Sequence, residues 1–316
     1  MNATGWFWVV VQTLLFLLSA PLFAAWVKRV KCWLQNRRSP PLLQSYRDLR
    51  RLFSKQVVLA HNASIIFRIT PYLVLGVMIL SASITPFISI NLPSSAVTDA
   101  IALTGFFAFA RFFLALSALD IGTAFGGMGS SREMTISALA EPAMLMMVFT
   151  VAMVAGSTNL STVMATIAEQ MVMTRPSLWF AALGFLLVAA AETGRVPVDN
   201  PGTHLELTMI HEAMILEFSG RHLAMLEWAA QIKLLVYAVI AVNIFIPWGL
   251  MYESSIDALT IALLCILAKL FALGTTLAVI ETVMAKMRLF RVSVFLTLAV
   301  VLSFGGMLSY IVLEVG

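Results

Sequence analysis

Charge is scarce in this chain of 316 residues. Only 11% of them are Asp, Glu, Lys or Arg, while 60% are hydrophobic, and the mean hydropathy is +0.94. Soluble domains carry roughly 25% charged residues, so the composition excludes a soluble globular protein. The apolar runs are continuous and about 20 residues long, unlike the short alternating segments of a β-barrel. We therefore expect an all-α integral membrane protein.

Cysteine and the common catalytic motifs are also nearly absent. Cys32 and Cys265 lie far apart and neither belongs to a CxxC pair, which argues against an iron–sulfur or zinc site built from cysteine. There is no P-loop, and the glycines at 126–133 follow an apolar span rather than a strand. His204 and His211 lack the ligand spacing of a metal site. We expect no catalytic residue and no metal site in this chain.

Positive charge is missing from the first 27 residues, where a signal peptide would need it. The first apolar run is therefore predicted to be a retained helix. Hydropathy predicts about eight membrane spans of roughly 20 residues each. They are placed at 6–27, 69–91, 98–118, 134–156, 177–193, 232–250, 257–283 and 292–313.

The basic residues fall almost entirely between alternate spans, and Arg175 alone lies in the opposite set of loops. Because cytoplasmic loops are enriched in Lys and Arg, both termini are predicted to be non-cytoplasmic. The chain is predicted to be a single polytopic membrane domain over 1–316. Its cytoplasmic loops are expected at about 28–68, 119–133, 194–231 and 284–291.

The first of these loops contains an amphipathic pattern. Apolar residues recur at helical spacing from Leu42 to Val57, and basic residues fill the other face, which predicts a helix in the membrane interface. That surface either contacts lipid headgroups or docks a peripheral subunit. The candidate docking residues are Arg37, Arg38, Arg47, Arg50 and Arg51.

Acidic residues are concentrated in one run at 191–220, although the whole chain has only 16. Carboxylates at the edge of a bilayer are costly, so the cluster indicates proton or redox-linked electrostatics. Thr203–Glu206 matches a capping box, which predicts a helix over 204–218 ended by Ser219-Gly220. Glu206 is thus either a cap partner or part of a proton path. The acidic candidates are Glu192, Asp199, Glu206, Glu212 and Glu217.

Ionisable residues also stand inside the predicted spans. Glu141 follows a second capping box at Ser130–Glu133, has no capping task of its own, and suits a proton relay. Lys269 lies near the middle of its span, and Glu281 lies near the end of the same span. Arg111 is a further intramembrane cation, which snorkelling could accommodate.

The acidic run resembles a known signature. The string Glu192-Thr-x-Arg195-x-Pro197-x-Asp199, then Pro201, Glu206-Leu207 and Glu217-Phe-Ser-Gly220, is similar to the loop of the membrane heel subunit of respiratory complex I. That family also includes a membrane subunit of nickel–iron hydrogenases such as formate hydrogenlyase. Further matches are Arg132 with Glu141, and Arg37-Arg38-x-Pro40.

Other segments resemble the hydrogenlyase-type branch of this family, among them Tyr46-Arg47-Asp48, residues 155–159 and residues 245–249. Gly202, Thr203 and His204 replace glutamates of the quinone-type branch. The resemblance therefore favours a hydrogenase-type role over a quinone site.

The resemblance implies a fold of eight transmembrane helices in a bacterial or archaeal inner membrane. It also implies a non-catalytic subunit without a cofactor of its own. This subunit links a soluble cytoplasmic redox arm to antiporter-like membrane subunits. The arm comprises hydrogenase-like large and small subunits and an iron–sulfur subunit, and it carries iron–sulfur and possibly nickel–iron centres. Two alternatives are a quinone-binding subunit of an NADH:quinone oxidoreductase and a stand-alone secondary transporter. The chain shows no internal repeat of the kind many transporters have.

The resemblance further assigns candidate roles by residue. Arg132 and Arg195 are implied as countercharges. The implied proton path comprises Glu141, Glu192, Asp199, Glu206, Glu212, Glu217, Lys269 and Glu281.

Overall fold

Helices form nearly all of the regular structure in the computed structural model, which describes residues 3–89, 98–169, 175–195, 209–249, 256–284 and 289–315. No strand forms within those ranges, so the prediction of an all-α fold is confirmed. The helices are α1 (Ala3–Leu34), α2 (Gln44–Phe53), α3 (Ile65–Ile84), α4 (Ala100–Asp120), α5 (Ala124–Ala155), α6 (Leu160–Glu169), α7 (Pro176–Glu192), α9 (His211–Ile215), α10 (Gly220–Phe245), α11 (Ile256–Val283), α12 (Leu289–Ser309) and a π-helical end at Tyr310–Val315.

Among the described residues, 7 helices are long and apolar enough to cross a membrane: α1, α3, α4, α5, α10, α11 and α12. The shorter helix α7, with 17 residues, stands where the remaining span was predicted. At 1.5 Å per residue it covers about 26 Å, close to the roughly 30 Å hydrocarbon core of a bilayer. The protein is therefore an integral membrane protein that crosses the bilayer several times.

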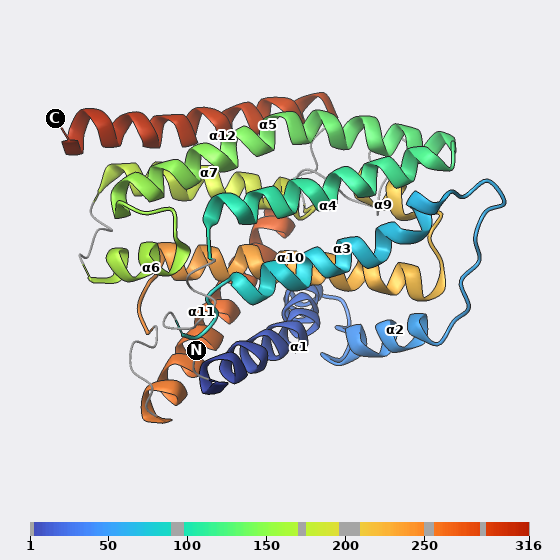
Figure 1. The fold of residues 1–316 in the computed structure, drawn as a ribbon, viewed down its shortest axis with the longest axis horizontal. Helices are drawn as coiled ribbons and strands as arrows, with labels where there is room; N and C mark the ends of the chain where they lie inside the picture. Colours follow the sequence, from blue (N-terminus) through green and yellow to red (C-terminus); the bar gives the residue numbers. More distant parts are fainter. Residues whose placement is uncertain are drawn as a thin grey trace.

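Helix α10 runs through the interior of the bundle (Figure 1). In its most apolar window 78% of the residues are buried, against 22% in the windows of α11 and α12. It packs against α1, α2, α3, α7 and α11, while α12 lies along α5 and α7. In Figure 1 α6 and the C-terminus lie toward one end of the long axis, and α2 and α9 lie toward the other. Polar side chains that α10 carries are thus placed among several helices.

The loop predicted at 119–133 is wrong, because α5 begins almost at once after α4 ends. The glycines there allow close packing rather than a turn. A Cβ at Gly126 would lie 2.5 Å from the carbonyl oxygen of Ala118, and one at Gly129 would lie 3.0 Å from the Cβ of Ala213. Glycine in a helix interior usually weakens the prediction of a helix, and here tertiary contact overrides that tendency.

The capping box predicted at Ser130–Glu133 is also wrong. Thr123 caps α5 instead, since its hydroxyl accepts a hydrogen bond from the N–H of Gly126 at 3.3 Å. The Ser130 hydroxyl donates to the carbonyl of Ala115 at 2.6 Å. Glu133 therefore lies inside a helix, where its carboxylate is available for another contact.

The loop predicted at 194–231 is too long, because α10 already begins at Gly220. The helix predicted over 204–218 is represented in the described residues only by the short α9, and its part at 204–208 lies outside them. Ser219-Gly220 therefore starts a helix rather than ending one.

Contacts with the first long loop explain this reversal. Gly220 has a left-handed φ of 54°, and a Cβ there would lie 2.3 Å from the carbonyl oxygen of Gln56. The Ser219 hydroxyl donates to the Val58 carbonyl at 2.9 Å and lies 2.8 Å from the Val58 amide nitrogen. These contacts hold the acidic run against the segment that follows α2.

Other boundaries shift less. Helix α1 continues to Leu34, so the first loop begins later than predicted at 28–68. Helix α3 ends at Ile84 rather than near 91, because Pro86 follows and proline cannot continue a helix. Helix α6 occupies a stretch between α5 and α7 for which no helix was predicted.

The amphipathic helix of the first loop forms as α2 and is shorter than the predicted pattern. Its apolar side packs onto α1 and α10: Leu49 is buried, and the rings of Phe53 and Trp228 meet edge-on at 6.3 Å. The Tyr46 hydroxyl donates to the carbonyl of Leu18. Burial raises the pKa of the Tyr46 phenol above its usual value.

Candidate functional site

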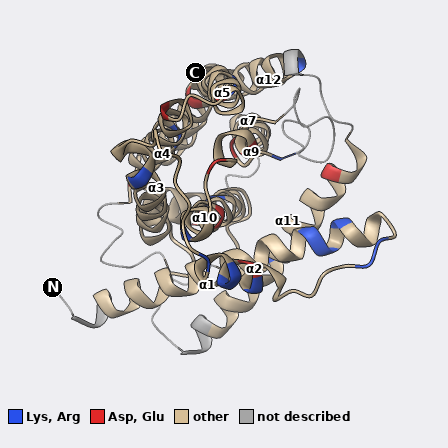
Figure 2. Cartoon of the chain, turned by 90° about the vertical axis from the view of Figure 1, so that its right-hand side faces the viewer, with Lys and Arg blue, Asp and Glu red and all other residues tan. Residues whose placement is uncertain are grey.

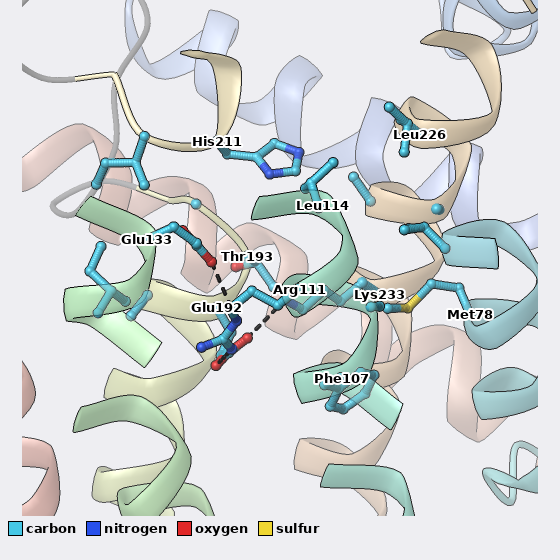
Figure 3. A pocket seen from close by; sticks show the side chains of 18 residues that line it. Met78, Phe107, Arg111, Leu114, Glu133, Glu192, Thr193, His211, Leu226 and Lys233 are labelled. Atoms are coloured by element: carbon cyan, nitrogen blue, oxygen red, sulfur yellow. Dashed lines mark hydrogen bonds and ion pairs between the residues drawn. The ribbon is translucent and has the colours of Figure 1, made fainter. Parts of the chain in front are cut away.

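Arg111 lies near the middle of α4, with its side chain only 4% exposed. Its Nη2 forms an ion pair with Oε1 of Glu192 at the end of α7. Its Nε lies 3.3 Å from Oε1 of Glu133, and its Nη1 lies 3.6 Å from Oε1 of Glu141, both on α5. Lys233 on α10 binds the other oxygen of Glu192 at 2.8 Å. These five residues are called the Arg111 cluster, and Figure 3 shows four of them.

Helix geometry and the shape of arginine explain this arrangement. Glu133 and Glu141 are separated by about 12 Å along the axis of α5, at 1.5 Å per residue. A guanidinium has five N–H donors in a planar fork, so one arginine can face several carboxylates at once. Ser137, one turn before Glu141, donates a hydrogen bond to Oε1 of that carboxylate. The cluster therefore joins α4, α5, α7 and α10.

The Arg111 cluster has more acid than base. With every group ionised, three carboxylates oppose one guanidinium and one ammonium, a formal charge of −1. The Arg111 and Glu192 side chains are 4% and 3% exposed, so the centre of the cluster is not screened by open solvent. An uncompensated charge in a membrane interior is costly, and one bound proton would make the cluster neutral.

Two cavities adjoin the cluster. The first holds about 80 Å³ and is lined by Glu133, Thr193, His211 and Lys233 together with apolar residues. The second holds about 240 Å³ and is lined by residues that include Thr104, Glu141 and Tyr237. Since one water in the liquid has a share of about 30 Å³, both are large enough for water. Phe107, Arg111 and Glu192 line both cavities.

A second group of ion pairs lies around Glu281 on α11, whose side chain is 2% exposed. Lys31 Nζ on α1 lies 3.0 Å from its Oε2, and Arg195 Nη1 lies 3.0 Å from its Oε1. We call these three residues the Glu281 cluster. Arg195, one of the two expected countercharges, faces Glu281 and stands three residues after Glu192. The turn after α7 thus touches both clusters.

The other expected proton-path residues are placed separately. Glu212 is half-buried on α9, and Glu217 is exposed in the turn before α10. Lys269 donates to the carbonyl of Ile246 at 2.5 Å, at the end of α10 and apart from the Arg111 cluster. Asp199 and Glu206 lie outside the described residues.

Arg132, the other expected countercharge, donates from Nη1 to the carbonyl of Met209 at 2.9 Å. It ties α5 to the segment that leads into α9. His211, which was weighed as a metal ligand, lines the first cavity. In the part of the chain that the structure describes, no group of three His, Cys, Asp or Glu side chains could hold a metal ion.

The five candidate docking arginines are all exposed. Arg37 and Arg38 follow α1, and the other three lie on α2. Figure 2 shows Lys and Arg gathered on α1 and α2 at the end of the bundle that faces the viewer. The geometry therefore makes a basic surface at the α2 end of the molecule.

Sequence reasoning missed three members of the Arg111 cluster. A capping box accounted for Glu133, snorkelling accounted for Arg111, and Lys233 was not singled out. The available signal was the expense of each charge within an apolar run. The sequence did not reveal that Glu133, Arg111 and Lys233 lie in one cluster.

These features define a class: a multi-pass, all-α membrane protein with a buried cluster of ion pairs beside two cavities. Residues 8–311 match the NADH dehydrogenase family, and the chain belongs to that family. The prediction of membership in the complex I-like membrane subunits is thereby confirmed.

Two curated relatives come from Escherichia coli (strain K12). The chain is 34% identical to formate hydrogenlyase subunit 4 over 279 residues, which are 88% of this chain and 90% of that protein. It is 31% identical to hydrogenase-4 component C over 285 residues, covering 88% of this chain and 87% of the relative. Both relatives carry names of subunits or components, so this chain is similar to parts of multi-subunit complexes.

A solved structure has the same fold. A chain of the membrane-bound sulfane sulfur reductase, an archaeal respiratory membrane complex, superposes with a TM-score of 0.77. The match covers 95% of this chain and 98% of that chain at 19% sequence identity. At that identity the likeness shows the fold alone.

Proposed function

We propose that this chain is the membrane-anchor and proton-coupling subunit of a complex I-like complex of the hydrogenase or formate hydrogenlyase type. The names of the two curated relatives support the type of complex. The observation that carries the coupling role is the Arg111 cluster, because a membrane interior tolerates such a group only for a reason.

The charge balance of the cluster suits proton exchange. Its formal charge is −1 with every group ionised and becomes zero when one carboxylate takes a proton. In the proposed role the cluster alternates between these two charge states. Cavities with room for water reach the carboxylates of Glu133, Glu141 and Glu192. Water and carboxylates are groups that pass protons over short distances. Neither an electron carrier nor a metal is needed at this position.

The position of Glu141 points to a neighbouring membrane subunit. Its side chain is 41% exposed, although it lies within the long span α5. A half-exposed carboxylate facing lipid would be unfavourable, whereas a partner subunit could offer it a polar group. We assign this side of the bundle to antiporter-like membrane subunits, to which the cluster would pass its charge or its proton.

The basic surface after α1 and on α2 is suited to bind a soluble partner. Exposed arginines bind carboxylates through paired hydrogen bonds and are common in interfaces. We assign this surface, made of Arg37, Arg38, Arg47, Arg50 and Arg51, to a cytoplasmic redox arm that carries iron–sulfur and possibly nickel–iron centres. With this surface in the cytoplasm, the proposal has both termini outside the cytoplasm, and it assigns no cofactor to this chain itself.

A quinone does not fit the Arg111 cluster. Pockets for cofactor-sized ligands hold about 300 to 1,000 Å³. The two cavities at the cluster hold about 80 and 240 Å³, and ion-paired side chains stand among the apolar residues that line them. We therefore assign no quinone step to these residues.

The test uses the intact complex, purified with its partners and reconstituted into liposomes. We expect Glu192→Gln and Glu141→Gln each to abolish proton translocation during redox turnover while the complex stays assembled. Gln keeps the shape of the side chain and removes the site for the proton. The measurements are the pH change of the lumen and the subunit composition on a native gel.

Glu169→Gln is the matched control, because Glu169 is an exposed carboxylate at the end of α6. It should translocate protons as the unmodified complex does. Normal translocation by both Glu192→Gln and Glu141→Gln would show that these acids are structural and that the coupling role is wrong.

A further inference from the structure

The two cavities at the Arg111 cluster meet along α4 at Phe107 and Arg111 and extend from there in opposite directions. The first touches α4 at Leu114, beyond Arg111 toward the α2 end, and the second touches it at Ile101, Thr104 and Ala108. From Ile101 to Arg111 the helix rises about 15 Å. The cavities are thus stacked along the bundle rather than side by side.

The residues that line both cavities mark where the two adjoin, and we take them as the partition between the cavities. They are Phe107, Arg111 and Glu192, from α4 and α7. The Phe107 ring is buried, stacks on Tyr237 at 4.9 Å between centroids, and lies 5.9 Å from Lys233 Nζ. An aromatic ring carries no exchangeable proton, so the polar part of the partition is the pair of Arg111 with Glu192 (Figure 3).

Arg111 can leave Glu192 without losing every anionic neighbour. Its Nε and Nη1 already lie near Glu133 and Glu141, yet neither atom makes a hydrogen bond. A small rotation of the guanidinium would turn these contacts into hydrogen bonds. Glu192 would keep Lys233 as its partner. Breaking a buried pair is costly when a charge is left alone, and here neither charge is.

We propose that Arg111 is the gate between the two cavities, an inference that rests on the proton-coupling role proposed above. With Arg111 on Glu192 the cavities are separate. When Arg111 turns toward Glu133 and Glu141, Oε1 of Glu192 takes a proton from a hydronium ion in the first cavity, which becomes water, and then gives it to a water molecule in the second cavity. The proton is carried by an O–H bond that forms and then breaks, and nothing is oxidised or reduced. Return of Arg111 closes the path.

A gate differs from a relay in what its removal does. Removing a relay residue stops proton movement, whereas removing a gate lets protons pass when they should not. The experiment therefore measures passive proton leak in proteoliposomes that contain the whole complex without its electron donor. A potassium diffusion potential drives the protons, and a dye in the lumen reports the pH.

We expect Arg111→Gln to raise the leak rate several-fold over that of the unmodified complex, since the shorter, uncharged side chain joins the cavities. Phe107→Ala opens the same partition without a change of charge and should also leak, which covers the case in which Arg111→Gln fails to assemble. Arg175→Gln is the matched control and should stay tight. Arg175 pairs with Glu314 at 3.5 Å and does not line either cavity.

The outcomes separate this inference from the proposed function. If the Arg111→Gln and Phe107→Ala complexes assemble and leak no faster than the unmodified complex, the gate proposal is wrong. It is also wrong if Arg175→Gln raises the proton leak rate as much as they do. If those variants are tight while Glu192→Gln still abolishes driven translocation, only the gate is wrong. If Glu192→Gln translocates normally as well, the coupling role has failed.

Discussion

The Arg111 cluster and the Glu281 cluster are both buried groups of ion pairs, but their charge balance is opposite. Around Arg111 three carboxylates meet two cations, while around Glu281 a single carboxylate lies between Lys31 and Arg195. Excess carboxylate leaves room for a proton to bind and leave. The Glu281 carboxylate has a cation on each of its two oxygens, a formal charge of +1 with every group ionised, and works as a clamp. Similar contacts can therefore serve exchange in one place and attachment in another.

The two clusters are connected through the turn that follows α7. Glu192 enters the Arg111 cluster and Arg195 enters the Glu281 cluster, with only two residues between them. The Glu281 cluster also ties α1 to α11, and the two helices pack against each other. Holding this turn fixes the position from which Glu192 projects. We expect the Glu281 cluster to position Glu192 rather than to carry protons.

The largest effect on proton translocation should come from changes in the basic surface. If a redox arm docks there, proton exchange at the Arg111 cluster depends on that docking. Reversing Arg47, Arg50 and Arg51 to Glu should detach the soluble subunits and abolish redox-driven translocation. The Glu281 clamp lies inside the bundle and should not be affected. Subunit composition after mild-detergent purification reports the detachment, and a thermal melt of the remaining membrane part reports the clamp. If the triple variant still purifies as an intact complex, this surface does not dock the soluble subunits and contacts lipid headgroups instead.

A smaller effect, on a different observable, should follow from Glu281→Gln. The change leaves the cations of Lys31 and Arg195 without their anion, and breaking a buried pair typically costs about 3–5 kcal/mol. We expect a lower melting temperature in detergent, with unchanged proton translocation per electron pair in the complexes that remain assembled. Loss of translocation without loss of stability would instead put Glu281 in the proton path.

The smallest effect should come from Lys31→Met. Lys31 is 32% exposed, and Glu281 keeps Arg195 as its partner. Partly exposed ion pairs contribute about 0–1 kcal/mol, so the melting temperature should change little. A melting temperature as low as that of Glu281→Gln would show that Lys31 carries most of the clamp.

Much of the fold could be predicted from single residues in their local setting. The spans around α4, α11 and α12 were placed to within a few residues, because apolar length is a local property. Glu141 and Glu192 were found for the same reason, as carboxylates at or inside apolar runs. The acidic run drew attention to the right turn of the chain, although Asp199 and Glu206 lie outside the described residues.

What could not be predicted depends on contacts between distant segments. Gly126, Gly129 and Gly220 suggested a loop and a helix end, but they are places where two backbones approach closely. Glu133 satisfied a capping pattern by sequence, yet it pairs with Arg111 from another helix. Hydropathy and capping patterns identify the charged residues that are unusual for their position. Only the packing of the helices shows which of these residues pair with one another.

The most direct test of the central difference is the number of protons moved per electron pair in Glu192→Gln and Glu281→Gln complexes, measured side by side in the same liposomes. If the Arg111 cluster exchanges protons and the Glu281 cluster only clamps, the first variant moves none and the second moves as many as the unmodified complex. Equal values for the two variants, whether both normal or both zero, would contradict the distinction.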